Sequence, residues 1–186
     1  MRVIAGTARS LQLVTPLGDG TRPTTDRIRE TLFNVLQNDV PGSVFVDLFA
    51  GSGACGIEAL SRGAKKAYFI ENNKEAIECI EKNVKHTKFV EESMVLKQDA
   101  LTALNYSIRE KVDILFVDPP YAKGFDRLVL ESGVNVACID EDTLIVIEEL
   151  RDHDFSYAYD LGYDIIKEKI YKSNKHVFLR RKSEND

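Results

Sequence analysis

Between residues 44 and 149 the sequence alternates short apolar runs with longer segments of helical periodicity. The apolar runs are VFVDLF (44–49), KAYFIE (66–71), MVLKQD (94–99), VDILFVD (112–118) and TLIVIEE (143–149). Short apolar runs separated by helical segments predict right-handed βαβ units on a parallel sheet. We therefore expect a Rossmann-like, doubly wound α/β fold, in which ligands bind beyond the carboxyl ends of the strands.

The two ends of the chain depart from this alternation. Residues 2–14 predict a short hairpin or strand pair, and a helix is expected from near Thr25, where apolar residues recur at helical spacing. Near the other end, YDIIKEKIYK and KHVFLRR flank Ser173-Asn174 and predict a closing antiparallel hairpin. The expected sheet is thus seven-stranded and mostly parallel. We expect one domain over residues 1–186, with an N-terminal extension (1–40) and a catalytic core (41–186).

Composition places the chain among ordinary globular proteins, with 44% hydrophobic and 30% charged residues. No apolar run approaches the roughly 20 residues that span a bilayer, and the N-terminus lacks the long apolar core of a signal peptide. The cysteines Cys55, Cys79 and Cys138 are widely spaced, without a CxxC pair. This spacing argues against a disulfide framework or a metal site and favours a reducing cytoplasm.

Charge is distributed unevenly along the sequence. The formal net charge is −5, yet residues 1–30 sum to +2 and residues 167–182 to +6, which leaves −13 for the rest. An acidic body with two basic ends is compatible with a localised phosphate-binding surface. Solvated charges on edge strands would explain the C-terminal cluster equally well.

The first strand of the alternating region leads into a glycine-rich segment, DLFAGSGACG. Gly51, Gly53 and Gly56 satisfy GxGxxG, and Glu71 lies 20 residues beyond Gly51 at the end of the next strand. Glycines let a backbone turn tightly and approach a ligand closely, and an acid at that second strand end can accept hydrogen bonds from ribose hydroxyls. The segment therefore predicts a site for a nucleotide-like ligand.

Acidic residues at the strand ends indicate which ligand. Asp47 precedes the glycines and suits an ammonium group better than the pyrophosphate of a dinucleotide. S-adenosylmethionine carries a ribose, an adenine and an amino-acid end, and no phosphate. Asp99 would be a third strand-end acid, either accepting from the adenine amino group or capping the helix that begins at Ala100. Together Asp47, Glu71 and Asp99 favour S-adenosylmethionine as the cofactor.

The fourth apolar run ends in Asp118-Pro119-Pro120-Tyr121, on the same side of the expected sheet as the glycine loop. Two prolines make a stiff, extended turn without N–H donors. The Asp118 carboxylate and the Pro119 carbonyl could therefore both accept from one exocyclic amino group, while Tyr121 offers a flat face to an extruded base. This tetrad predicts methyl transfer to the amino nitrogen of a base.

These residues resemble the class I S-adenosylmethionine-dependent methyltransferases, and the tetrad resembles the (D/N/S)PP(Y/F/W) motif of amino-directed N-methyltransferases. RVIAGTARSLQL, RPTTDRIRETLFNVL, DLFAGSGACGIEALSRGA and FVDPPY also occur in the order typical of the RsmD family. The resemblance extends from Arg2 to the basic tail. It implies methylation of guanine N2 at position 966 of 16S rRNA, in a small ribosomal subunit or an assembly intermediate.

The resemblance also implies roles for individual residues. Its catalytic residues are Asp118, Pro119, Pro120 and Tyr121. Its cofactor-binding residues are Asp47, Phe49, Gly51, Ser52, Gly53, Glu71, Asn72, Asp99 and Ala100. Its RNA-binding residues are Arg9, Arg22, Thr24 and Arg27. Arg29 is either a further phosphate contact or a solvated helix arginine. After Arg9 the chain has Ser10 and Leu11, where many members have glycine and a basic residue.

Several alternatives stay open at this point. The tetrad would serve adenine N6 or cytosine N4 as well as guanine N2, so a DNA or protein N-methyltransferase is the nearest rival. The glycine motif and Glu71 also allow an NAD(P)-dependent oxidoreductase. A catalytically silent RNA-binding protein on the same fold is a third alternative. The length of the chain leaves little room for a separate target-recognition domain, which favours a substrate already shaped by folded RNA or ribosomal protein.

Overall fold

A computed structural model of the protein describes residues 1–16, 26–121 and 123–183. Its strands are β1 (Val44–Asp47), β2 (Lys66–Glu71), β3 (Ser93–Lys97), β4 (Ile114–Val117), β5 (Leu144–Leu150), β6 (Tyr163–Ile170) and β7 (Asn174–Arg181). They form one sheet in the order β3-β2-β1-β4-β5-β7-β6. β1 to β5 are parallel, and β7 runs antiparallel to both of its neighbours. The predicted seven-stranded, mostly parallel sheet is confirmed.

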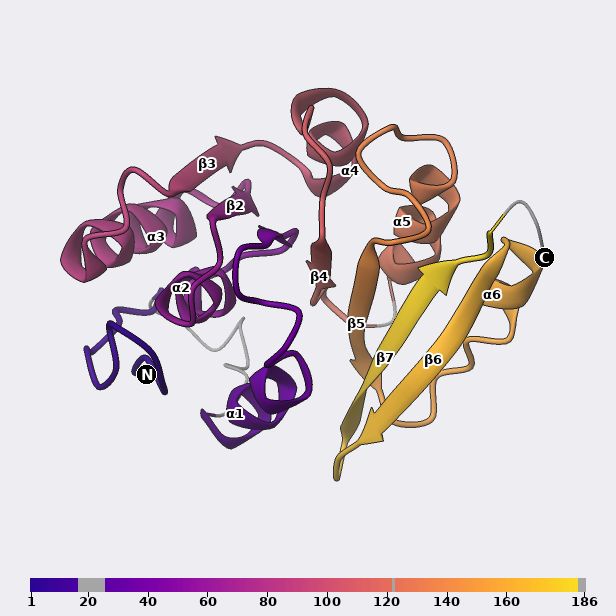
Figure 1. The fold of residues 1–186 in the computed structure, drawn as a ribbon, viewed down its shortest axis with the longest axis horizontal. Coiled ribbons are helices and arrows are strands. Elements are labelled where there is room, and N and C mark those ends of the chain that lie inside the picture. Colours follow the sequence, from indigo (N-terminus) through magenta and orange to yellow (C-terminus); the bar gives the residue numbers. More distant parts are fainter. Residues whose placement is uncertain (17–25, 122, 184–186) are drawn as a thin grey trace.

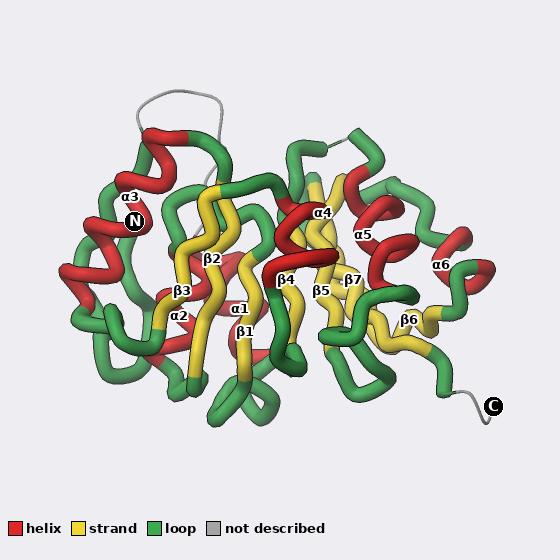
Figure 2. Tube along the Cα trace, turned by 90° about the horizontal axis from the view of Figure 1, so that it is seen from above, coloured by secondary structure: helices red, strands yellow, loops and turns green. Residues whose placement is uncertain are grey.

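Helices cover both faces of the sheet (Figures 1 and 2). One face carries α1 (Asp26–Val35), α2 (Ala54–Ser61) and α3 (Lys74–Thr87), and the other carries α4 (Ala100–Thr102), the π-helical turn η1 (Ala103–Ser107), α5 (Phe125–Gly133) and α6 (Tyr157–Asp160). The α1–α2 side is centred on the stacked rings of Phe33, Phe45 and Phe116. The buried strands have apolar side chains on both faces, as parallel strands between helices require.

Several elements are shorter than the sequence pattern predicts. The predicted strand over 112–118 is paired only at Ile114–Val117, because Pro119 has no N–H and restricts the residue before it. The predicted helix over 100–110 is a single α-turn followed by η1. Asp118 thus lies just beyond the end of its strand.

The N-terminal extension is a hairpin, as predicted, although no regular strand is assigned to it. Residues 1–13 double back with one antiparallel bridge, between Arg2 and Gln12, and the N–H groups of Val3 and Leu13 donate to the carbonyls of Leu11 (3.0 Å) and Met1 (2.9 Å). The hairpin also bonds to α2: Glu58 accepts from the N–H groups of Ile4 (2.8 Å) and Ala5 (3.1 Å), and the Ser61 hydroxyl oxygen accepts from the N–H of Ala8 (2.9 Å). Side chains of α2 therefore hold the hairpin on the core.

No helix within the described ranges is long and apolar enough to cross a membrane.

Candidate active site

The glycine loop and the Asp-Pro-Pro-Tyr tetrad lie at the switch point of the sheet. β1 and β4 are neighbours in the centre, and the strand order runs outward from them in opposite directions. Asp47 ends β1 opposite Phe116 of β4, and Asp118 follows two residues later. In doubly wound sheets ligands occupy the crevice beyond the carboxyl ends of the strands at this point.

Three glycines shape the loop between β1 and α2. Gly51 (φ +53°) and Gly53 (φ +77°) adopt left-handed conformations that other residues rarely take. Gly56 instead allows α2 to pack on β2, since a Cβ there would lie 2.4 Å from the Phe69 ring. The loop is also tied to the end of β2, because the N–H of Gly51 donates to Glu71 Oε2 (2.9 Å).

Asp47 is buried beneath the loop, with 2% of its surface exposed. Its Oδ2 accepts from the N–H of Gly56 at 3.0 Å. Burial raises the pKa of Asp47 to about 7, against the lowering effect of this hydrogen bond, and the charge of Glu71 raises it further. A cationic amino group beside Asp47 would favour its charged form. The site is thus chemically suited to the amino-acid end of S-adenosylmethionine.

The other predicted cofactor residues line the same strand ends. Glu71 Oε1 accepts from the N–H of Asn72 and of Asn73, both at 2.9 Å. Asp99 caps α4 by accepting from the N–H of Thr102 (2.9 Å), and the hydrogen bonds from Thr102 lower the pKa of Asp99. The capping interpretation of Asp99 is confirmed, and its adenine contact stays a prediction. The first helical residue, Ala100, is buried.

Phe49 and Ser52 connect the loop to other parts of the chain. The Phe49 ring lies 5.4 Å from the ring of Phe125, at the start of α5, so the glycine loop touches the segment that follows the tetrad. The Ser52 hydroxyl contacts Met1 Sδ at 3.7 Å. Asn83 of α3 donates to the Ser52 carbonyl (2.9 Å) and to that of Val14 (2.8 Å), which fastens the N-terminal extension beside the loop.

The tetrad itself is partly enclosed. Pro119 is buried, Pro120 is exposed, and Asp118 and Tyr121 are half-buried. The Tyr121 hydroxyl donates to Glu148 Oε1 at 2.9 Å. Burial, followed by the charges of Glu148 and Asp118, raises the pKa of Tyr121 well above its usual value. Tyr121 therefore stays a neutral hydrogen-bond donor.

Sequence reasoning missed the residues behind Tyr121. Glu148 near the end of β5 also accepts from Asn174 Nδ2 (2.6 Å) and lies 2.9 Å from His176 Nε2, both on β7. A signal was present, because an acid after the apolar run TLIVI is the same pattern that singled out Asp47 and Glu71. The partners of Glu148 come from β7, and its antiparallel position beside β5 could not be predicted from the sequence pattern.

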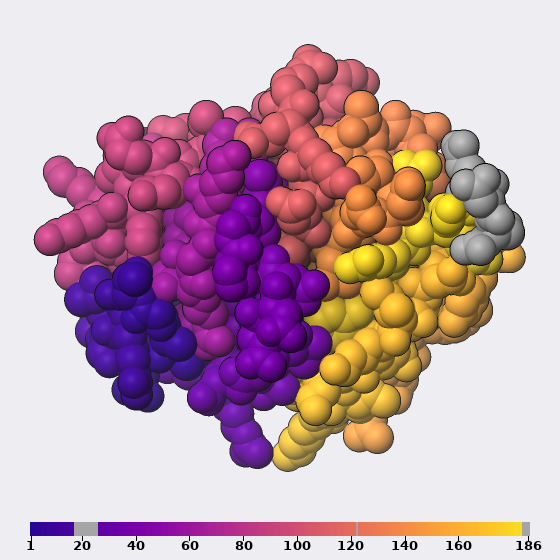
Figure 3. All heavy atoms as spheres, viewed as in Figure 1, coloured from indigo at the N-terminus to yellow at the C-terminus, as the bar shows by residue number. Residues whose placement is uncertain are grey.

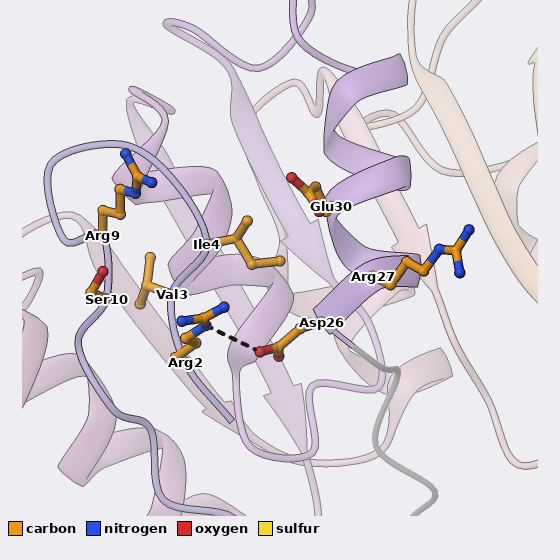
Figure 4. A pocket seen from close by; sticks show the side chains of 8 residues that line it. All are labelled: Arg2, Val3, Ile4, Arg9, Ser10, Asp26, Arg27 and Glu30. Carbon is orange, nitrogen blue, oxygen red and sulfur yellow. Dashed lines mark ion pairs between the residues drawn. The ribbon is translucent and has the colours of Figure 1, made fainter.

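The predicted RNA-binding arginines lie around a pocket of about 360 Å³ between the N-terminal extension and α1. Figure 4 shows Arg9 and Arg27 at opposite sides of it, with the ion pair of Arg2 and Asp26 (3.5 Å) between them. Arg9 and Arg27 are exposed. Arg22 and Thr24 lie outside the described residues.

Arg29 differs from both roles expected of it. It is fully buried, contacts the Arg2 carbonyl, and lies 3.1 Å from Asp26 Oδ1 and 3.9 Å from Glu58 Oε2. A guanidinium enclosed in this way cannot reach a phosphate. Arg29 is therefore a structural residue beneath the N-terminal extension.

Among the described residues, no group of three or more His, Cys, Asp or Glu side chains could hold a metal ion.

Comparisons with known proteins agree with this geometry. The family described as "Conserved hypothetical protein 95" matches residues 1–180. Ribosomal RNA small subunit methyltransferase D of Escherichia coli is 37% identical over 152 residues, covering 80% of this chain and 74% of that protein. Its counterpart in Haemophilus influenzae is 36% identical over 158 residues, covering 82% and 80%.

The fold is shared as well. The solved structure of the yhhF protein of Escherichia coli superposes with a TM-score of 0.86 at 31% identity and covers 99% of both chains. Both the sequence and the whole architecture therefore match. The chain belongs to the RsmD family and is an S-adenosylmethionine-dependent methyltransferase.

Proposed function

We propose that this protein methylates the exocyclic N2 amino group of a guanine in 16S rRNA, within a small ribosomal subunit or an assembly intermediate in the cytoplasm. The observation that carries the proposal is the position of Asp118–Tyr121 across the switch point from the glycine loop. The relatives named as ribosomal RNA small subunit methyltransferases support rRNA as the substrate class. The choice of guanine N2 rests on the resemblance to the RsmD family.

Alignment contributes most to such a reaction, because methyl transfer from a sulfonium is an in-line displacement. S-adenosylmethionine supplies an electrophilic methyl group, and Asp47, Glu71 and the glycine loop would hold it. The Asp118 carboxylate and the Pro119 carbonyl would accept from the two amino protons of the base. These bonds favour a pyramidal nitrogen with its lone pair directed at the methyl group. A C–N bond forms as the C–S bond breaks, and the proton then leaves the nitrogen for solvent.

The N-terminal extension is assigned to the RNA in this proposal. Arg9 and Arg27 are exposed on either side of the pocket in Figure 4, where each could contact a phosphate of the RNA backbone. Residues 1–40 would thus position the RNA, while residues 41–186 bind the cofactor and carry out the transfer. Asp26 and Glu30 also line the pocket and would disfavour phosphate close to themselves.

The test uses purified protein, labelled S-adenosylmethionine and small subunits that lack base methylation, followed by mass spectrometry of the digested nucleosides. N2-methylguanosine is the expected product. N6-methyladenosine or N4-methylcytidine would overturn the choice of base, and label in protein alone would overturn RNA as the substrate. Asp118→Ala should abolish turnover and leave cofactor binding intact, whereas Asp39→Ala, at an exposed position, should retain turnover.

A further inference from the structure

Three neighbouring strands place polar side chains in one row at the edge of the active site. Val117 of β4 is level with Ile147 of β5, so the next residues, Asp118 and Glu148, follow side by side. Glu148 is in turn paired with His176 of β7. Side chains alternate along a strand, so Glu148 and His176 share the sheet face of Phe116 and Val146, which α1 and α2 cover.

Asp118 and Glu148 also lie near the start of α2. The Cys55 thiol is in the first turn of α2, and its pKa is raised chiefly by burial and then by the charge of Asp47, which Arg29 opposes. The charges of Asp118 and Glu148 raise it as well, so both carboxylates are within electrostatic range of α2.

Glu148 is buried, with 3% of its surface exposed, and three side chains donate hydrogen bonds to it. Oε1 accepts from Tyr121 (2.9 Å) and Asn174 (2.6 Å), and Oε2 from His176 Nε2 (2.9 Å). A carboxylate only accepts, so Nε2 carries the hydrogen, and His176 Nδ1 lies 3.0 Å from the Tyr171 hydroxyl oxygen. Burial opposes ionisation, but the hydrogen bonds from these donors hold the pKa of Glu148 below its usual value.

His176 is itself held firmly. It is fully buried, and its ring lies edge-on to Phe116 (6.1 Å) and to Tyr171 (5.2 Å). The carboxylate of Glu148 is thus fixed from behind by two β7 side chains, and it presents one oxygen to the loop that carries Tyr121. A fixed acceptor of this kind sets the direction of a phenolic O–H.

From these contacts we propose that Glu148, fixed by His176 and Asn174, is a positioning residue that sets the orientation of the Tyr121 ring against the acceptor base. The backbone fixes one end of the Tyr121 side chain, and the hydrogen bond to Glu148 fixes the hydroxyl at the other end. Because a phenolic O–H prefers to lie in the plane of its ring, this bond also favours one orientation of the ring plane. The inference rests on the proposed function, because it assigns Tyr121 as the stacking face of the tetrad. Holding that face in advance reduces the ordering needed when a base enters.

The side-chain bonds of Glu148 are not needed to attach β7 to the sheet. β5 and β7 are already paired continuously, from Ile145 with Leu179 to Leu150 with Asn174. The ladder would hold β7 in place without Glu148. A buried carboxylate with three side-chain donors is costly to build where apolar residues would pack as well, so its contact with Tyr121 is a specific use.

A double-mutant cycle tests the inference. Tyr121→Phe and Glu148→Ala should each lower kcat on small subunits about tenfold, and leave the KM for S-adenosylmethionine unchanged. The double variant should be no slower than either single one, because both remove the same contact. Glu148→Gln keeps an oxygen for Tyr121 and Asn174 and should restore most of the rate. Glu149→Gln, the buried neighbour on the opposite face, is the matched control and should retain wild-type kcat.

Two kinetic results would overturn the inference. If the two effects multiply in the double variant, Glu148 does not act through Tyr121. If Glu148→Ala lowers only the unfolding temperature and leaves kcat intact at a temperature where it is folded, its role is structural.

A readout without turnover separates this inference from the proposed function. In protein with isotope-labelled tyrosine rings, Tyr121→Phe identifies the Tyr121 resonance. That resonance should shift in Glu148→Ala and shift much less in Glu149→Gln, which removes a nearby charge but not the hydrogen bond to Tyr121. An unshifted resonance would reject the positioning role even if guanine is methylated. A shifted resonance together with another methylated base would retain the role and reject the choice of guanine.

Discussion

The two ends of the chain are each attached to the core beside a buried carboxylate, and Figure 3 shows them on opposite sides of the molecule. Glu58 of α2 binds the N-terminal extension, and Glu148 of β5 binds side chains of β7. Glu58 receives the backbone N–H groups of Ile4 and Ala5 and the guanidinium of Arg62 (2.7 Å). Glu148 receives side chains, and one of them belongs to the catalytic tetrad.

The difference lies in what else holds each end. The extension has a few backbone bonds within its short hairpin and is tied to the core by α2, whereas β7 pairs along its length with β5 and, across a register shift, with β6. We therefore expect a buried carboxylate to be structurally required at the N-terminal end. At the C-terminal end the backbone already provides the attachment, which leaves Glu148 to orient Tyr121.

The largest effect on stability is expected when Glu58, the carboxylate at the N-terminal end, is removed. Glu58→Ala removes the carboxylate that Arg62 binds, leaves buried Arg29 with Asp26 alone, and leaves two backbone N–H groups without an acceptor. We therefore expect a loss of about 3–5 kcal/mol in the free energy of unfolding. Urea unfolding measures the loss. Glu78→Ala, at an exposed position of α3, is the control and should change stability by less than about 0.5 kcal/mol. A change below about 1 kcal/mol in Glu58→Ala would show that the extension is held in another way.

Asp47 is a third buried carboxylate, and it can be compared with Glu58 and Glu148. It accepts a hydrogen bond from the N–H of Gly56, whereas Glu58 and Glu148 each accept from several donors. Its pKa is raised from 3.8 to about 7, so the folded state binds more protons than the unfolded state between these values. Stability is lost as the pH rises through this window, by up to about 4 kcal/mol above pH 7. Asp47→Asn removes the loss, so it should be more stable than the wild type at pH 8, and this advantage should shrink toward pH 4.

Urea midpoints of both proteins at pH 5 and pH 8 test this pH dependence, and the exposed Asp39→Asn is the control. Calorimetry should show weaker S-adenosylmethionine binding in Asp47→Asn, because an amide cannot attract an ammonium group. A constant stability difference across the pH range would mean that the pKa of Asp47 is not raised in the folded protein.

Gly6 tests how closely the extension approaches α2. Gly6 and Gly42 have similar left-handed angles, φ +82° and +79°, but a Cβ on Gly6 would lie 1.7 Å from the Ser61 carbonyl oxygen, whereas Gly42 has nothing within 4 Å. Gly42→Ala should therefore cost only the backbone strain, about 1–2 kcal/mol. Gly6→Ala should exceed it by about 1–3 kcal/mol, because the extension must move away. Equal losses in urea unfolding would contradict the tight contact.

The parts of the site that were predictable are those that follow from local patterns. Asp47, Glu71 and Asp118 were identified because each follows a short apolar run, and parallel strands bring such ends to one edge. The glycine spacing identified the loop for a similar reason. Neither inference needed knowledge of which strands are neighbours.

The partners of buried charges were not predictable from the same patterns. Arg29 reads as a surface residue on an amphipathic helix, yet it lies beneath residues 2–5 and faces Glu58, 29 positions away in the sequence. His176 meets Glu148 because β7 is inserted between β5 and β6, an order that periodicity does not encode. The surroundings of Arg29 and His176 are thus set by contacts between segments far apart in the sequence.

The smallest expected effect is on an ion pair of the C-terminal hairpin. Lys175 Nζ lies 2.7 Å from Glu168 Oε1, across the β6–β7 pair, and the side chains of Lys175 and Glu168 are 10% and 36% exposed. Solvent reaches Glu168 and screens the pair, and Lys175 keeps its contact with the Phe155 ring (5.4 Å), so Glu168→Gln should cost less than about 1 kcal/mol. Urea unfolding at low and high salt measures the loss, which should shrink as salt rises. A loss comparable to that of Glu58→Ala would mean that the hairpin depends on side-chain charges rather than on its ladder, and the contrast between the two ends would fail.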